Sequence, residues 1–226
     1  LEGDPDSEFR IQVKLPTVNN GDGPGIWARM ANFNASNSFG AFFYPEVGDE
    51  VSVGFLDDDP RQPVVLGSMY SSSLPPVETP ADDNYIKSLQ TKSGIRFELD
   101  DENKIITVET PGGHTTTMDD ENKKIEVKTS GGHSLTMDDS GSSIELKDSN
   151  GNSIKMSSSG ITIASATALN LTASTNLTAS GDTGVDISGL KVALSADTTF
   201  EAAGSASAKF SSSGIATISG SLVNIN

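Results

Sequence analysis

The chain has 226 residues, of which 35% are hydrophobic, 6% aromatic and 20% charged, with a formal net charge of −16 and no cysteine. This charge argues against binding to nucleic-acid phosphates or to anionic lipid headgroups, and the lack of cysteine excludes disulfides, a thiol nucleophile and a cysteine zinc site. No apolar run reaches the ~18 residues of a membrane span. The first residues have no signal-peptide character and no initiator Met, so we expect a fragment of a longer protein.

Large side chains concentrate in residues 1–70, where short alternating runs are separated by Gly, Pro, Asn and Asp. In the first run, the alternate residues from Phe9 to Leu15 fall on one face of a strand. Five short strands without a helical period predict a small closed barrel of the OB type, with Trp27 and the aromatic cluster at 39–44 in its core. The expected strands cover residues 9–15, 25–31, 40–44, 50–56 and 63–69.

Residues 71–92 differ from the segments on either side, because they are rich in Ser and Pro. Proline has no N–H to donate to a sheet and favours extended structure. We therefore expect a connector here.

A repeat of 19 residues begins at residue 93 and continues to about residue 160. Each unit reads as strand, acidic turn, strand and glycine turn, and the second strand alternates plainly, as in Ile125-Glu126-Val127-Lys128. Successive units are marked by Gly94, Gly113, Gly132 and Gly151, and by the pairs Asp100-Asp101, Asp119-Asp120 and Asp138-Asp139.

After residue 160 the period shortens to about eight. Apolar residues recur in pairs two positions apart, such as Leu169 with Leu171, so each octad predicts a short strand with two inward side chains and a small or polar corner. The segment 161–226 is therefore expected to continue the β-structure in shorter steps.

One octad cannot close a core by itself. Two modest apolar side chains do not offset the ~1–2 kcal/mol per residue that backbone ordering costs, whereas single-chain solenoids use ~20 or more residues per coil. Several chains must share one core, and three walls form the smallest closed prism, which also leaves no sheet edge exposed. We therefore predict an all-β chain in which an OB-type barrel precedes an intertwined trimeric, triple-stranded β-helix needle. Its expected core residues are Leu99, Ile106, Met118, Ile125, Met137, Ile144, Met156, Ile161, Ile163, Leu169, Leu171, Leu177, Val185 and Ile187.

Four stretches of the first domain closely resemble the OB domain of the VgrG and phage baseplate spike family, and the octads up to Asn226 resemble the end of that family's needle. The resemblance implies a homotrimeric spike that an inner tube carries and a contracting sheath drives through a target envelope. The family's N-terminal hub domains, which join needle to tube, are absent here, and the connector leaves no room for a lysozyme domain. The stretches are residues 8–16, 25–29, 42–51 and 54–67.

The resemblance also implies partners and a location. A PAAR-repeat protein would sit on the needle's end, hub or inner-tube proteins would bind through the missing N-terminal region, and the target membrane would be contacted only mechanically. The protein would assemble in the bacterial cytoplasm without a signal peptide and be delivered outside the cell or into the target envelope. At the tip, open strand edges around apolar side chains are a template for such a partner, and the expected docking residues are Leu222, Val223, Asn224, Ile225 and Asn226.

Candidate catalytic and metal-binding residues are scarce. His114 and His133 lie one repeat apart and could form rings in a trimer that bind a metal; the alternative is two solvent-exposed turn residues. The acidic turns suggest calcium, but they lack the β-roll signature and are typical of solvated turns. No Gly-x-Ser-x-Gly elbow is present. We expect no catalytic residues, no bound metal and no cofactor.

Two functions of different classes remain open at this point. The first is a structural puncturing spike of a contractile injection apparatus, in a type VI secretion system, an extracellular injection particle or a phage tail, with no enzymatic activity. The alternative is a trimeric adhesin or tail-fibre protein that binds a cell-surface receptor, for which an aromatic-rich terminal knob would be typical.

Overall fold

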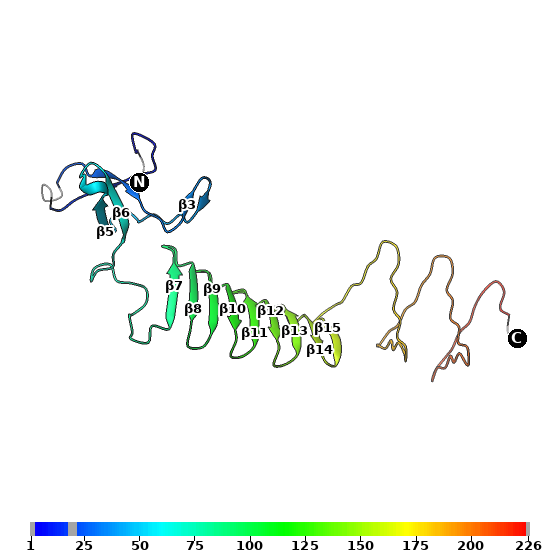
Figure 1. Cartoon of the computed structure of the whole chain (residues 1–226). Coiled ribbons are helices and arrows are strands. Elements are labelled where there is room, and N and C mark those ends of the chain that lie inside the picture. The colour runs from blue at the N-terminus through cyan, green and yellow to red at the C-terminus, as the bar shows by residue number, and fades with distance from the viewer. Residues whose placement is uncertain (1–2, 18–21, 225–226) are drawn as a thin grey trace. The chain divides into compact units, whose positions relative to one another are not determined.

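The computed structural model describes residues 3–17 and 22–224, and almost all of their regular structure is β (Figure 1). The all-β class predicted from the sequence is thereby confirmed, and the described part of the chain contains no helix long and apolar enough to cross a membrane. A short 3-10 turn lies at Leu56–Asp58. The strands of the first domain are β1 (Ile11–Val13), β2 (Ile26–Met30), β3 (Ala35–Ser36), β4 (Phe39–Gly40), β5 (Val51–Phe55) and β6 (Pro63–Ser68).

Four of these strands form one sheet in the order β1-β2-β6-β5. The β1–β2 and β5–β6 pairs are antiparallel and β2–β6 is parallel. The alternation in β1 sends Ile11 and Val13 to the same side, where they pack with Ala28 and Val65 in a small core. This core is the only cluster of fully buried apolar side chains among the described residues.

The structure corrects three details of the predicted barrel. In the described residues β1 and β5 are not paired, so the sheet stays open, and β3 pairs only with β4. Phe9 does not continue the β1 face, because its backbone turns at φ 57° and its side chain is exposed. The predicted aromatic core is only partly right. Tyr44 packs against the small core, but Trp27 is half-buried and Phe39, Phe42 and Phe43 are exposed. The β3–β4 hairpin, which contains Phe39, does not pair with the four-stranded sheet.

One carboxylate organises the segment before β1. The Asp4 side chain accepts the backbone N–H of Glu8 at 2.8 Å and of Arg10 at 3.1 Å, and it pairs with the Arg10 guanidinium at 2.6 Å. The hydrogen bond from the Arg10 side chain holds the pKa of Asp4 far below its usual range. The turn at Ser7–Phe9 is therefore held by charge-assisted hydrogen bonds.

A second sheet contains nine strands in strict sequence order, from β7 to β15, each antiparallel to the next (Figure 1). The predicted alternation of acidic and glycine turns joins them. The sheet begins inside the segment expected to be a connector, because Ile86–Gln90 pairs with Arg96–Asp100. The strands are β7 (Ile86–Gln90), β8 (Arg96–Asp100), β9 (Ile105–Glu109), β10 (Thr115–Asp119), β11 (Lys124–Lys128), β12 (Ser134–Asp138), β13 (Ser143–Lys147), β14 (Ser153–Ser157) and β15 (Gly160–Ala164).

The rest of the described chain, residues 165–224, forms no strand and no helix. The octads were expected to be short strands, and within one chain they find no ladder partner. Each octad contains a corner, so we expect strand pairing in this segment to come from another chain.

Candidate functional site: an open apolar face

Two rows of side chains, apolar except for Thr116, run across the nine-stranded sheet. Neighbouring members of a row are direct cross-strand partners, and residues two apart on a strand share a face, so both rows lie on the same side. The first row is Leu99, Ile106, Met118, Ile125, Met137, Ile144, Met156 and Ile161. The second row is Leu89, Phe97, Val108, Thr116, Val127, Leu135, Leu146, Ile154 and Ile163.

This apolar face is open in the single chain. In its middle, Ile144 and Ile154 are each 40% exposed and Leu146 is 54% exposed. A contiguous apolar surface of this extent on a soluble protein marks an interaction site. The expected core residues up to Ile163 all lie on this one face; that they point toward an assembly axis stays a prediction.

The second row was not part of the predicted core, apart from Ile163. The 19-residue repeat contains its signal, because Phe97, Leu135 and Ile154 recur at multiples of 19, as Val108, Val127 and Leu146 do. The same repeat placed Ile163 in line with Ile144, whereas the structure pairs Ile163 with Ile154. The turn between Ser157 and Gly160 is shorter than the acidic turns, so Ile161 takes the place next to Met156.

The opposite face of the sheet is polar and ion-paired. Glu126 contacts the Lys124 ammonium at 3.2 Å and the Lys128 ammonium at 2.6 Å. Partial burial acts to raise the pKa of Glu126, but the hydrogen bonds from Lys128 and Lys124 outweigh it and leave the pKa below its usual value. On β8, Arg96 pairs with Glu98 and, at 2.6 Å, with Glu78. One face of the sheet is therefore polar and ion-paired, and the other is apolar. Among the described residues, only the apolar face has no side-chain partners covering it.

The acidic turns are held by their own first aspartate. Asp100 accepts the Asn103 side-chain N–H at 2.8 Å and the Asn103 backbone N–H at 3.1 Å, and Asp119 is held by Asn122 in the same way. These hydrogen bonds, the side-chain one above all, lower the pKa of both carboxyl groups. The described residues contain no group of three or more His, Asp or Glu that could hold a metal. These aspartates therefore have a structural role in the turn.

The two histidines connect successive glycine turns. The Nδ1 atom of His114 accepts the backbone N–H of Ser130 at 3.3 Å, and His133 accepts that of Ser149 at 3.4 Å. Both side chains are exposed, as expected for turn residues, but this acceptor role was not predicted. A histidine that accepts a hydrogen bond at Nδ1 carries its ring proton on Nε2.

In the neighbouring repeats, too, the side chain at the histidine position matches the backbone N–H available in the next turn. Asn152 occupies the histidine position one repeat later, and its Oδ1 accepts the Ala166 N–H at 2.9 Å. One repeat earlier the position is Ile95, which has no acceptor, and the residue 16 positions after it is Pro111, which has no N–H. An acceptor is therefore present in each repeat where a donor needs one.

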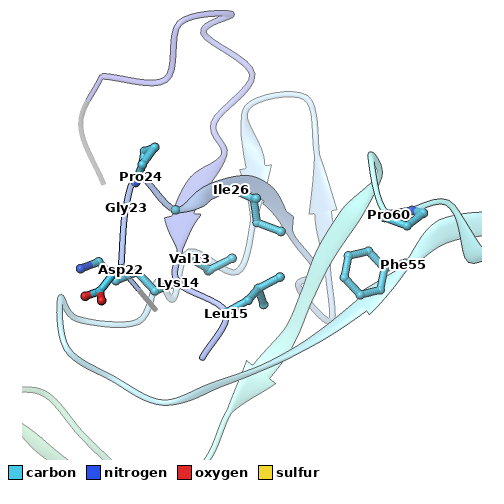
Figure 2. Close-up of a pocket in the computed structure, with 10 residues that line it drawn as sticks. Val13, Lys14, Leu15, Asp22, Gly23, Pro24, Ile26, Phe55 and Pro60 are labelled. Carbon is cyan, nitrogen blue, oxygen red and sulfur yellow. The ribbon is translucent and has the colours of Figure 1, made fainter. Parts of the chain in front are cut away.

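Figure 2 shows the hollow on the first domain, about 300 Å³ in volume. Leu15, Ile26 and Phe55 are among its apolar lining residues, and Lys14 and Asp22 line it as well. Its lining residues include no histidine and no serine.

The expected tip residues are only partly described. Leu222, Val223 and Asn224 are exposed, and Leu222 has 77% of its surface accessible. Ile225 and Asn226 lie outside the described residues. The octad residues Leu169, Leu171, Leu177, Val185 and Ile187 are also exposed in the single chain.

Comparisons with known proteins identify the family of the first domain and of the C-terminal part of the chain. The type VI secretion system/phage-baseplate injector OB domain matches residues 2–70, and the phage baseplate V C-terminal trimerisation domain matches residues 124–226. An OB domain followed by a trimerisation domain defines a trimeric baseplate spike. The chain belongs to the VgrG and phage baseplate spike family.

Curated relatives agree with this assignment. The spike protein VgrG4b of Pseudomonas aeruginosa is 37% identical over 38% of this chain, and VgrG5 of the same organism is 42% identical over 26%. VgrG3 of Vibrio cholerae is 32% identical over 30%. The matched segments cover only 11%, 8% and 7% of those relatives, so the chain spans a small part of their length.

The predicted homotrimer agrees with the trimerisation domain. It also explains the open apolar face, because two further copies of the chain can cover side chains that this copy leaves exposed.

We expect Ile144→Asp to destabilise the trimer strongly. The change places an uncompensated charge between Met137 and Met156 in each of three chains, which should cost several kcal/mol per trimer. Glu145→Gln is the matched control, since Glu145 is the next residue on the opposite face and its loss should change stability by about 0.5 kcal/mol or less. Thermal unfolding followed by circular dichroism measures both. If the two variants lower the unfolding temperature equally, the core does not lie on the face that contains Ile144.

His114→Ala should expose the Ser130 amide. Without the Nδ1 acceptor, hydrogen exchange at Ser130 should become faster, whereas exchange at Ser149, which His133 holds, should not change. His114→Asn should restore protection, because Asn152 plays the same role in its own repeat. Amide exchange measured by NMR decides this, and unchanged exchange in the alanine variant would refute the acceptor role.

Proposed function

We propose that this chain is the barrel-and-needle part of a structural puncturing spike in a contractile injection apparatus, and that it has no enzymatic activity. The open apolar face carries the proposal. A one-layer sheet with two exposed apolar rows is stable only when other copies cover it, and three copies with hydrogen-bonded walls make a stiff rod without hinges. Stiffness is what a protein pushed through an envelope requires.

The relatives support this function in their names, which call them spike proteins of type VI secretion systems. The described residues support it by the acidic turns, in which Asp100 and Asp119 accept hydrogen bonds from Asn103 and Asn122 and so hold the turn. The proposed location follows from the function, with assembly in the bacterial cytoplasm and delivery outside the cell or into the target envelope. Hub or inner-tube proteins would hold the spike at its N-terminal side.

A test in the parent bacterium uses the full-length protein with Ile144→Asp or Glu145→Gln. The proposed spike requires the trimer, so the aspartate variant should abolish contraction-dependent delivery of a reporter cargo, whereas the glutamine variant should deliver as the natural protein does. Sedimentation equilibrium of the 226-residue chain with the same substitutions should give three times its 23.5 kDa mass for the glutamine variant. Normal delivery by a variant that no longer trimerises would rule out the spike function.

We further propose that a conical tip protein of the PAAR-repeat type docks on the last octads. The support is the exposure of Leu222 and Val223 and the lack of strand pairing in residues 165–224 of one chain, which leave apolar side chains and backbone groups free for a partner. Ile225 is expected to lie beneath the partner as well.

Deletion of residues 221–226 tests the docking site. The shortened protein should remain trimeric but lose binding of its cognate PAAR-repeat protein, which should bind the intact trimer at one copy per three chains. Titration calorimetry measures both affinity and stoichiometry. A shortened trimer that binds as tightly as the intact one would place the docking site elsewhere.

A further inference from the structure

The first domain carries an aromatic segment that its own core does not use. Residues 30–45 contain no charged side chain, in a chain where 20% of residues are charged. Within this segment Phe33 is 89% exposed, Phe42 82% and Phe39 69%. Aromatic residues without charged neighbours are the composition of the buried centre of a protein interface, and exposed aromatic rings of this number do not fit a solvated loop.

The aromatic segment has a fixed shape. Its β3–β4 hairpin is closed by the Ala41 N–H, which donates to the Asn34 carbonyl at 2.8 Å. Gly40 adopts φ 136°, and a Cβ at this position would lie 2.6 Å from that carbonyl, so only glycine fits. The pairing brings Phe39 opposite Ser36. The hairpin therefore presents its rings in a defined arrangement.

Tyr44 ties the aromatic segment to the first domain's sheet. Its ring packs against the small core, and its hydroxyl donates to the Phe9 carbonyl at 3.0 Å. The Phe42 ring lies against it at a tilt of 37°, with ring centroids 4.8 Å apart. Because the surface is largely preformed, binding to it costs little ordering entropy.

We propose that the aromatic segments of the three protomers pack against one another, so that the trimer has a second interface outside the trimerisation domain. The inference rests on the homotrimer. Residues 124–226 hold three chains together, which gives the three first domains a high effective concentration for one another. An apolar surface that recurs three times in one assembly is covered most readily by the other copies.

The charge distribution favours a copy of the same chain as the occupant. Residues 1–70 contain 11 acidic and 4 basic residues, so two first domains repel each other where charged surfaces meet. The uncharged aromatic segment is a place where like-charged copies can approach. A basic partner protein would instead bind the acidic surface, outside this segment.

Single-cysteine cross-linking tests the proposal, since the natural chain has no cysteine. Ser38→Cys puts a thiol in the hairpin turn beside Phe39, and Asp58→Cys is the control in an exposed acidic loop of the same domain. With a short bis-maleimide, the trimer carrying Ser38→Cys should give cross-linked chains and the control should not. Adding Phe33→Ser and Phe39→Ser should reduce the cross-linking several-fold. Phe42 is left intact because its ring lies against Tyr44 of its own chain.

Sedimentation equilibrium of every variant separates this proposal from the trimer on which it rests. If the Ser38→Cys protein is trimeric but cross-links no better than the control, or if the two serine substitutions leave cross-linking unchanged, the second interface is refuted and the trimer stands. A melting curve adds an independent readout. The serine substitutions should lower the unfolding temperature of the first domain in the trimer, whereas Leu66→Ser, at a residue 61% exposed outside the segment, should not.

Discussion

The architecture depends on one constraint: a single layer of sheet has two faces, and within the described residues no other helix or strand covers either face of the long sheet. On one face the cost is small, because Lys, Glu and Arg side chains pair with one another in water, as they do around Glu126. On the other face two rows of mostly apolar side chains remain exposed. The hydrophobic effect therefore makes assembly a condition of stability, and the trimerisation domain assigned to residues 124–226 meets that condition. Beyond that domain the rows continue to Leu99 and Leu89, with Thr116 as a polar member of the second row.

The two parts of the needle solve the hydrogen-bonding problem differently. In residues 86–164 every strand pairs with its neighbours in the same chain, so a partner needs to supply only apolar contact. In residues 165–224 no strand pairs within the chain, so a partner must supply backbone hydrogen bonds as well. The change coincides with the shortened turn between Ser157 and Gly160 and with the shift from 19-residue units to octads.

Much of this could be predicted from the sequence because the repeat is regular. Alternation with period two and the 19-residue spacing fix which residues are cross-strand partners, and the rows up to Met156 follow directly. The 19-residue spacing predicts the wrong place for Ile163, because the turn between Ser157 and Gly160 is shorter than the acidic turns. The repeat alone does not show this shortening. The aromatic segment failed for another reason: size and apolarity predict burial, but they do not show whether a ring is buried in its own chain or in an assembly. The acceptor role of His114 needs the three-dimensional stacking of turns whose members are 16 residues apart in sequence.

The in-chain pairing of β7 to β15 also has a consequence for the order of folding. Each strand pairs only with the strand just before or after it in sequence, so the loops to be closed are short and the sheet can form quickly in an isolated chain. The octads have only contacts with other chains to gain, and they must wait for an encounter between molecules. The rows of three such sheets repeat every 19 residues, so alignments slipped by a whole unit would also match. The change from 19-residue units to octads near residue 160 breaks this repeat and distinguishes the correct alignment from the slipped ones. The regular meander would then bring the chains together, and the octads would fix their register.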